Sequence, residues 1–387
     1  MGRGAVMPQV DVIVLGAGPA GSAAAAVAAR AGLSVALVDK ASFPRDKLCG
    51  GGVTERSRAY FKDAFGYDIQ FDDILSTQEV EFWHAGQRLS HMQAEAPIHL
   101  AMRLSFDDQM FRHALSLGAL DYSGHRVTYI NGTSLELAGG TSLEAKVLIG
   151  ADGVNSQVAR HLFGAAFDHD QIGFALEVEA PKEDDSAALR IDFNAADWGY
   201  GWRFPKQENV TVGVGGLTSH NPDMKARMQS YTDLLNLNSI PKLKGHFLPF
   251  GHFKTQPGRG ATLLAGDAAG LVDPITGEGI AYAIKSGHLA AEAVIEALKA
   301  NTPDRAFAIY LRKLKPIHRN LRIARTLRKL VFSGRFKDAF FQKMAQSGRL
   351  RHEYLNVLAG KQEYPALLLK SGLSLPRFVL RGLRRRS

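Results

Sequence analysis

The sequence contains little cysteine and no long apolar run. Of its 387 residues only Cys49 is a cysteine, which excludes an internal disulfide and a zinc site built from several thiolates. We therefore expect no metal site, and because one cysteine fits a reducing compartment we expect a cytoplasmic protein. No uninterrupted apolar run approaches the roughly 20 residues that a membrane-spanning helix requires.

Acidic residues are scarce in the last part of the chain. Residues 305–387 contain 21 Lys and Arg but only three Asp and Glu, whereas residues 1–304 contain 26 basic and 35 acidic residues. A basic region of this kind can bind anionic lipid, nucleic acid or an acidic protein. No motif of a nucleic-acid-binding fold is present, so we expect no nucleic-acid partner.

What the sequence does contain is a complete βαβ unit over residues 10–40. An apolar strand leads into the turn GAGPAG, an alanine-rich helix follows, and a second apolar strand ends on Asp39. Gly16 makes the tight turn, Gly18 lets the backbone approach a pyrophosphate, and Gly21 lets the helix pack on the strand. The unit predicts an adenine dinucleotide site, with Asp39 at the ribose, but does not distinguish NAD from FAD.

Two more turns follow buried strands. Residues 146–156, KVLIGADGVNS, place Asp152 just after a strand, and residues 261–280, ATLLAGDAAGLVDPITGEGI, place Asp267 just after another. Open α/β sheets bind ligands at the carboxyl ends of their strands. The loop punctuated by proline and glycine precedes a helix and presents free N–H groups.

A loop at residues 43–53, FPRDKLCGGGV, places three consecutive glycines beside Cys49. Such a run suits a backbone that passes close to a flat ligand. The sequence has no second Gly-x-Gly-x-x-Gly motif and no pair of cysteines, which excludes a disulfide reductase with two nucleotide sites.

The three turns, in this order, resemble the FAD-dependent oxidoreductases of the para-hydroxybenzoate hydroxylase superfamily over about residues 10–300. Two stretches narrow the resemblance. Residues 44–52, PRDKLCGGG, are similar to the Pro-Arg-x-Lys-x-Cys-Gly-Gly pattern of geranylgeranyl reductases, and residues 200–205, YGWRFP, are similar to that family's Tyr-x-Trp-x-Phe-Pro pattern. Flavin-dependent halogenases carry a related Trp-x-Trp-x-Ile-Pro pattern, from which this sequence differs at two positions. The proline that the reductase family has three residues before the tyrosine is Asp197 here.

The resemblance implies an α/β fold with a Rossmann-type FAD-binding domain, an antiparallel-sheet substrate domain and a helical, basic C-terminal region. The implied FAD-binding domain is discontinuous and comprises residues 8–75, 100–165 and 255–300. The substrate domain comprises residues 76–99 and 166–254, and the C-terminal region comprises residues 301–387. Within the substrate domain, residues 79–89 alternate like one strand.

The resemblance also implies which residues contact FAD. The first turn holds the ADP half, the second approaches the cofactor, and the third holds the pyrophosphate and ribityl chain. The implied cofactor residues are Gly16, Gly18, Ala20, Gly21, Asp39, Lys40, Arg45, Gly50, Gly51, Arg103, Asp152, Gly153, Gly266, Asp267, Pro274, Gly277, Gly279 and Ile280.

The implied activity is reduction of isoprenoid double bonds of the geranylgeranyl type. FAD, reduced by NADPH or by another donor such as ferredoxin, passes a hydride from N5 to the alkene, which also takes up a proton. Cys49, Tyr200 and Trp202 are the candidate catalytic residues, because a thiol or phenol can supply a proton and an aromatic face tolerates developing positive charge. Phe204 and Pro205 are the candidate substrate pocket.

Two other functions fit the same sequence. One is a flavin-dependent monooxygenase or halogenase that acts on an aromatic or polyketide-like substrate, and the other is a flavin-binding regulator without catalytic activity. Leucines interleaved with cations over residues 365–387 predict an amphipathic surface, so we also expect peripheral association with a membrane.

Overall fold

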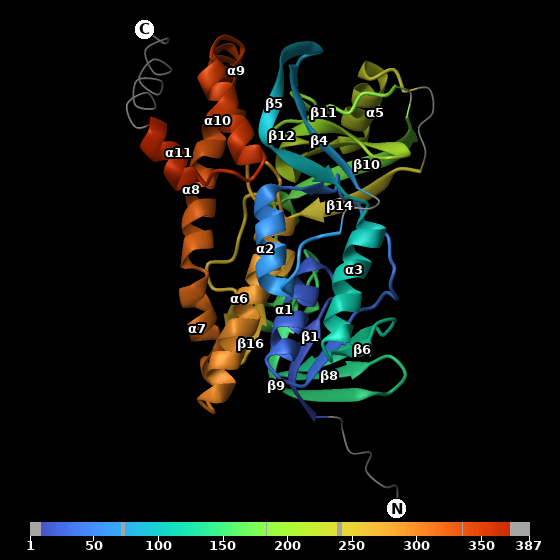
Figure 1. The fold of residues 1–387 in the computed structure, drawn as a ribbon, viewed down its shortest axis with the longest axis vertical. Helices are drawn as coiled ribbons and strands as arrows, with labels where there is room; N and C mark the ends of the chain where they lie inside the picture. The colour runs from blue at the N-terminus through green and yellow to red at the C-terminus, as the bar shows by residue number, and fades with distance from the viewer. Residues whose placement is uncertain (1–8, 71–73, 183, 238–241, 335, 372–387) are drawn as a thin grey trace, which may run out of the picture.

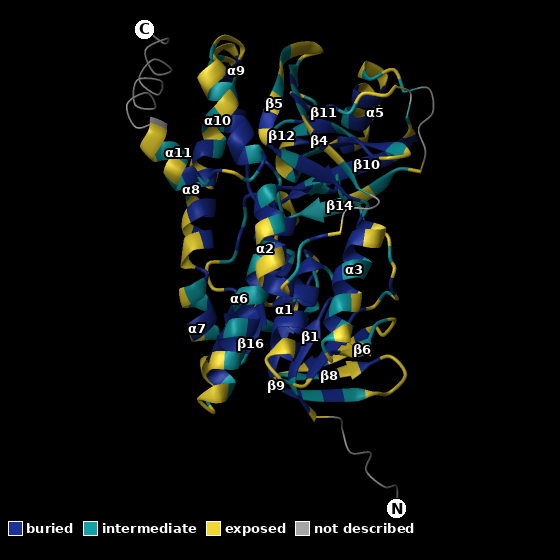
Figure 2. Ribbon diagram, in the orientation of Figure 1, coloured by how far each residue is buried: buried dark blue, intermediate teal, exposed yellow. Residues whose placement is uncertain are grey.

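The computed structural model describes residues 9–70, 74–182, 184–237, 242–334 and 336–371. Two eight-stranded sheets form its two halves, one in the lower part of Figure 1 and one in the upper part. Helices surround the lower sheet, and a column of helices runs along one side of both halves (Figure 1). Figure 2 shows that the central strands of both sheets are buried.

The lower sheet grows from the βαβ unit. Its order is β15-β16-β9-β1-β2-β6, and β8 and β7 extend it beyond β9. The strands are β1 (Gln9–Leu15), β2 (Val35–Val38), β6 (Leu120–Tyr122), β7 (Val127–Asn131), β8 (Ser134–Leu137), β9 (Ser142–Gly150), β15 (Gly258–Arg259) and β16 (Thr262–Leu264). β1 pairs in parallel with both β2 and β9, and β16 pairs in parallel with β9. The parallel strands β1, β2 and β16 are nearly continuous apolar runs. This is expected where helices cover both faces of a sheet.

Helices lie close to this sheet. They are α1 (Pro19–Arg30), α2 (Glu55–Phe65), α3 (Arg103–Ser116), α4 (Gln157–Phe163) and α6 (Ile280–Lys299), with short 3₁₀ turns at η3 (Gly266–Ala269) and η4 (Pro303–Arg305). The alanine-rich α1 is buried from Pro19 to Ala29. It lies so close to α6 that a Cβ atom at Gly287 would come within 2.0 Å of the Ala20 carbonyl oxygen.

The upper sheet has the order β14-β10-β13-β12-β11-β4-β5-β3. Its elements are β3 (Gly52–Val53), β4 (Leu75–His84), β5 (Gln87–Leu100), β10 (Gly173–Pro181), β11 (Leu189–Phe193), β12 (Gly199–Pro205), β13 (Asn209–Leu217) and β14 (Lys244–Leu248), with η1 (His169–Gln171), η2 (Thr218–His220) and α5 (Met224–Leu234) between or beside them. Most neighbouring strands are antiparallel, but β11 and β4 run parallel.

The expectation of a single strand over residues 79–89 is wrong. β4 ends at His84 and β5 begins at Gln87, so the segment is a hairpin. Ala85 and Gly86 form its turn with φ angles of 49° and 76°. Both residues have positive φ, as a type I′ hairpin turn requires, but Ala-Gly lacks the asparagine or aspartate that makes such a turn recognisable in a sequence.

The C-terminal region is helical, as expected. It contains α7 (Ala306–Lys313), α8 (Lys315–Phe332), α9 (Lys337–Gln346), α10 (Gly348–Leu358) and α11 (Tyr364–Ser371). α8 joins the two halves, because Leu321 packs in the core of the lower sheet and Phe332 packs in the core of the upper one. Within the described residues no helix is both long and apolar enough to cross a membrane. Residues 372–387, which carry most of the expected amphipathic surface, lie outside the described part of the chain.

The α/β fold class with its Rossmann-type unit, antiparallel-sheet region and helical C-terminal region is confirmed. The residue boundaries of the three domains stay a prediction. β3, which belongs to the upper sheet, comes from the Cys49 loop and ties that loop to the end of β5 through Gly52 and Leu100.

Candidate functional site

A cavity of about 850 Å³ is lined by residues of both sheets. Its volume falls within the roughly 300–1,000 Å³ of ligand sites in proteins. Gly16 and Asp39 line it from the carboxyl ends of β1 and β2, and Ala151 from the end of β9. Ala175 and Trp202 line it from the upper sheet. The cavity therefore lies where open α/β sheets bind their ligands.

The glycines of the first turn permit contacts that a side chain would block. Gly16 has a φ of 100°, and a Cβ atom there would lie 2.3 Å from the Ala151 carbonyl oxygen. A Cβ atom at Gly21 would lie 1.6 Å from the Gly16 carbonyl oxygen, so Gly21 serves helix packing. At Gly18 the nearest atom would be the flexible end of Arg45, at 3.3 Å. Gly18 is the N-cap of α1 and provides no side-chain cap, and it lines the cavity together with Pro19 and Ala20, so the N-terminus of the helix lies at the cavity.

Asp39 stabilises the turn through hydrogen bonds to the backbone. Its carboxylate accepts hydrogen bonds from the Ala17 N–H at 2.8 Å and from the Ala41 N–H at 2.9 Å. A carboxylate can accept further hydrogen bonds, so a ribose contact stays compatible with this geometry. Asp152 has a similar structural role, because it accepts from the Ser156 hydroxyl at 2.5 Å and from the Gln157 N–H at 2.6 Å at the start of α4. Burial raises the pKa of Asp152.

The Cys49 loop packs directly on β12. A Cβ atom at Gly50 would lie 2.9 Å from the Phe204 ring and 3.3 Å from the Trp202 indole nitrogen. The Gly51 N–H donates to the Cys49 sulfur at 3.3 Å, with Gly51 at a φ of 74°. The structure thus brings together the cysteine loop and the aromatic strand, which lie about 150 residues apart in the sequence.

Tyr200 donates its hydroxyl proton to the Thr276 carbonyl oxygen. Burial raises the pKa of Tyr200. The contact fixes the loop between Asp267 and α6 against β12. Whether this phenol also takes part in proton transfer stays a prediction.

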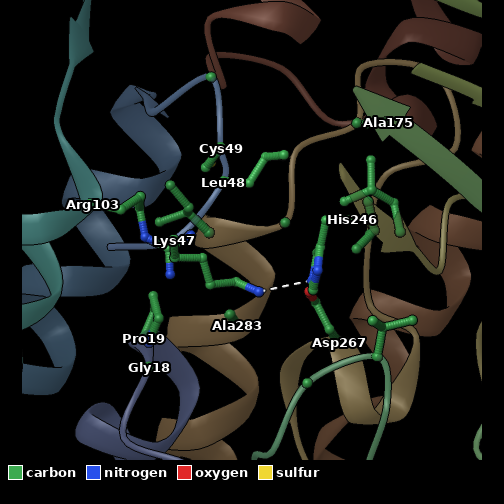
Figure 3. A pocket seen from close by; sticks show the side chains of 18 of the residues that line it. Gly18, Pro19, Lys47, Leu48, Cys49, Arg103, Ala175, His246, Asp267 and Ala283 are labelled. Carbon is green, nitrogen blue, oxygen red and sulfur yellow. Dashed lines mark hydrogen bonds between the residues drawn. The ribbon is translucent and has the colours of Figure 1, made fainter. Parts of the chain in front are cut away.

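Lys47 and His246 meet inside the cavity, and neither was predicted as a site residue from the sequence. The Lys47 ammonium lies 2.8 Å from His246 Nε2, with Asp267 beside them (Figure 3). Burial lowers the pKa of Lys47. Burial and then the cations Lys47 and Arg103 lower the pKa of His246 to about 3, so this imidazole is neutral at physiological pH. Lys47 belongs to the cysteine loop at residues 43–53, which the sequence did indicate. His246 belongs to β14, which carries no motif.

Arg103 lies at the cavity but is held by a carboxylate. It begins α3, and its guanidinium donates to Asp107 at 2.6 and 2.7 Å. Arg45 Nη2 lies 3.0 Å from the same carboxylate. Arg45 Nη1 is buried without a hydrogen-bond partner among the described residues, which leaves a donor for an anionic ligand.

Most of the predicted site residues line the cavity. They are Gly16, Gly18, Ala20, Asp39, Lys40, Arg45, Cys49, Gly50, Gly51, Arg103, Asp152, Gly153, Tyr200, Trp202, Phe204, Asp267, Gly277, Gly279 and Ile280. Gly21, Pro205, Gly266 and Pro274 do not line it. The ligand-binding roles of all these residues stay predictions.

Comparison with known proteins gives the family. The profile of the family described as FAD dependent oxidoreductase matches residues 11–141. An uncharacterized protein of Methanosarcina barkeri is 33% identical over 361 residues, which is 91% of this chain and 89% of that protein. Menaquinone reductase of Mycobacterium tuberculosis is 34% identical, covering 73% of this chain and 76% of that protein. Geranylgeranyl diphosphate reductase of Rhodobacter capsulatus is 30% identical, covering 76% of this chain and 77% of that protein.

The chain belongs to the geranylgeranyl reductase family of FAD-dependent oxidoreductases. Among solved structures, a geranylgeranyl bacteriochlorophyll reductase-like protein of Thermoplasma acidophilum has a TM-score of 0.80 at 23% identity and covers 95% of this chain and 99% of that one. The flavin-dependent brominase Bmp2 has a TM-score of 0.69 at 20% identity, with coverage of 95% of this chain and 99% of that one. At such identities the likeness shows a shared fold.

The residues present fit FAD. A dinucleotide needs uncapped helix N–H groups and a bare backbone near its pyrophosphate, and the start of α1 at Gly18 offers both. α6 begins at Gly279 without a side-chain cap, at another point of the cavity wall. The buried free donor of Arg45 is available to a group that carries negative charge.

Replacement of Gly18 by alanine should separate cofactor binding from folding. The new Cβ atom meets only the flexible end of Arg45, so the thermal unfolding of the apoprotein should not change. The same methyl group stands where the pyrophosphate must approach, and FAD affinity should fall at least about tenfold, or about 1.4 kcal/mol. Flavin fluorescence titration measures the affinity and differential scanning fluorimetry the unfolding.

Gly348→Ala is the matched control, because its Cβ atom would meet nothing closer than 3.9 Å at the start of α10. It should bind FAD as the wild type does. Wild-type affinity in Gly18→Ala would contradict the placement of the pyrophosphate.

Proposed function

We propose that the protein reduces carbon–carbon double bonds of an isoprenoid substrate with FAD as its cofactor. The observation that carries the proposal is the packing of the Cys49 loop on the Tyr200–Phe204 segment of β12 at one end of the cavity. The names of the relatives support it, since they are reductases of geranylgeranyl compounds and of menaquinone.

The end of the cavity near the upper sheet suits a hydrocarbon chain. Its wall there is built from apolar and aromatic side chains, namely Ile98, Leu189, Ile191, Trp202, Phe204, Leu248 and Phe250. Such a wall excludes water and holds an alkene in one orientation, which brings the reacting atoms together. The upper sheet also contributes Lys244 and His246 of β14 to the lining.

FAD, when bound and reduced, supplies a hydride, and NADPH is the electron donor that we propose for it. An unactivated alkene also needs a proton, because positive charge develops at its more substituted carbon. Cys49 carries the proton that we assign to this step, and the face of Trp202 stabilises the developing charge. Tyr200, through its bond to the Thr276 carbonyl, keeps the loop before α6 against the aromatic strand.

The holoenzyme, reduced with dithionite under argon, should be re-oxidised by geranylgeranyl diphosphate, with a hydrogenated product detected by mass spectrometry. Cys49→Ala removes the proposed proton donor and should slow this re-oxidation about 10²-fold, with FAD still bound. Cys49→Ser keeps the shape of the side chain without an acidic proton and should be slow as well.

An unchanged rate in both variants would remove Cys49 from the mechanism while leaving the substrate assignment in place. No re-oxidation of the wild type by any isoprenoid, together with oxygen uptake stimulated by an aromatic compound, would overturn the proposed function in favour of an oxygenase or halogenase.

We also propose that the protein binds the membrane surface through its basic C-terminal end. α11 exposes Leu369, whose side chain is 85% accessible, beside Lys370, and the sequence beyond it continues with leucines and arginines. Anionic headgroups attract such a segment by roughly 1 kcal/mol for each cation close to the surface. An isoprenoid substrate dissolves in the membrane, so surface binding would bring the enzyme to it.

Flotation with liposomes that contain anionic lipid should carry the full chain to the top of a density gradient. A chain that ends at residue 364 should float less, and the difference should disappear at high salt because the attraction is electrostatic. Liposomes of neutral lipid are the control. Equal flotation of both chains would contradict a role for this end.

A further inference from the structure

Two buried ionisable side chains, Glu177 and Lys206, lie behind the part of the cavity wall formed by Cys49, Gly50 and Trp202. We propose that Glu177 stores the proton that restores the Cys49 thiol after each turnover, and that Lys206 sets how readily Glu177 releases it. This inference rests on the proposed function, because it assigns Glu177 to the proton delivery of the same reaction. Neither residue belongs to any motif of the sequence.

The register of the upper sheet places Glu177 next to Trp202. Glu177 of β10 lies opposite Gly213 of β13, and Gly213 lies opposite Trp202 of β12. Residues directly opposite one another share a face of the sheet. A Cβ atom at Gly213 would lie 2.3 Å from the Trp202 ring, so the indole lies across the glycine toward the carboxyl group. Glu177 Oε2 and Trp202 Nε1 are both buried, and the indole N–H is one of the groups that lower the pKa of Glu177.

Glu177 and Lys206 bind the backbone of successive residues, Cys49 and Gly50, of the cysteine loop. Glu177 Oε1 accepts a hydrogen bond from the Cys49 N–H at 3.2 Å. The Lys206 ammonium donates to the Gly50 carbonyl oxygen at 2.5 Å and to the Ala101 carbonyl oxygen at 3.3 Å. The carboxyl group is thereby fixed at the residue that carries the thiol, on the side of the loop away from solvent.

The surroundings of Glu177 bring its pKa close to neutral pH. Glu177 and Lys206 are each 2% exposed. Burial raises the pKa of Glu177 to about 7, with Lys206 as the main opposing charge. Burial lowers the pKa of Lys206 to about 8, although Cys49, Glu177 and Glu179 act to raise it. A group whose pKa lies near the operating pH can both give and regain a proton.

Other charged groups face this pair from the neighbouring strands. Glu179 lies two residues along β10 and raises the pKa of Glu177. Lys244 of β14 lies opposite Glu177 in the sheet, but its ammonium binds Asp46 at 2.6 Å and Glu179 at 3.1 Å. Lys206 is therefore the cation that mainly opposes the rise in the pKa of Glu177.

The proton balance of the proposed step is closed. The alkene receives a hydride from the reduced cofactor, whose electrons come from a nicotinamide donor. It receives a proton from Cys49, so that an S–H bond breaks and a C–H bond forms. The O–H bond of Glu177 then breaks and the S–H bond forms again. Solvent returns a proton to the carboxylate, and no further oxidant or reductant is needed.

Glu177→Gln tests whether Glu177 supplies the proton, because the amide keeps an oxygen for the Cys49 N–H but has no acidic proton. In the holoenzyme kcat for isoprenoid reduction should fall about 10²-fold with KM unchanged. The wild-type kcat should decline as pH rises through about 7, as the carboxyl loses its proton, and this decline should be absent in Glu177→Gln. A normal circular dichroism spectrum and retained flavin would show that the variant is folded.

Lys206→Met tests whether Lys206 lowers the pKa of Glu177. The test lies in the direction in which the pH profile of kcat moves, which a purely structural role would not produce. Removal of the opposing cation stabilises the neutral acid, so the pH at which kcat declines should move upward. Lys146→Met is the matched control, because this lysine binds Asp11 on the surface of the lower sheet at 2.7 Å. It should leave the profile where it is in the wild type.

Infrared difference spectroscopy provides a readout without substrate. The carbonyl stretch of a protonated carboxylic acid should disappear with a midpoint near pH 7 in the wild type, be missing in Glu177→Gln and move to higher pH in Lys206→Met. No such band, or a pH profile that neither variant changes, would overturn the inference. A wild type that shows the band but reduces no isoprenoid would instead overturn the proposed function and, with it, this use of the proton.

Discussion

The close contact between the Cys49 loop and β12 is the constraint on which the rest of the structure depends. Gly50 has no side chain, so the backbone of the loop can rest on Phe204 and Trp202. This contact joins the chain that leaves the βαβ unit to the middle of the upper sheet. One continuous cavity results, with dinucleotide-type features at one end and an aromatic wall at the other. A larger residue at position 50 would push the two sheets apart at this point.

The C-terminal helices support the opposite wall of the cavity. Arg56 of α2 binds Glu278 at 2.5 Å, and it also donates to the Gln362 carbonyl oxygen at 3.1 Å. Tyr364 of α11 donates to Asp273 at 2.9 Å. Asp273 and Glu278 lie at the two ends of the loop that precedes α6 and lines the cavity. The helical region therefore positions a cavity loop, and its last described helix leads directly into the basic end of the chain.

The sequence was sufficient for the features that depend on local chain geometry. Gly16 and Gly21 have the close contacts that their spacing predicts, and the strand ends at Asp152 and Asp267 converge on one cavity. The sequence was insufficient for residues that reach the cavity through the pairing of strands far apart in the chain. Neither Glu177 nor His246 belongs to a motif, because each reaches the cavity region only through the pairing of β10 and β14. The hairpin at Ala85 was missed because its turn lacks the usual asparagine or aspartate.

A crystal structure of the protein with FAD bound tests the central claim most directly, namely that one cavity joins the dinucleotide turn to the cysteine loop. We expect the adenosine end to lie at Asp39 and the flavin ring to lie against the backbone of residues 50–52, with one face open toward Trp202. Electron density for the flavin ring away from the Cys49 loop, with residues 49–52 and β12 unchanged, would contradict it.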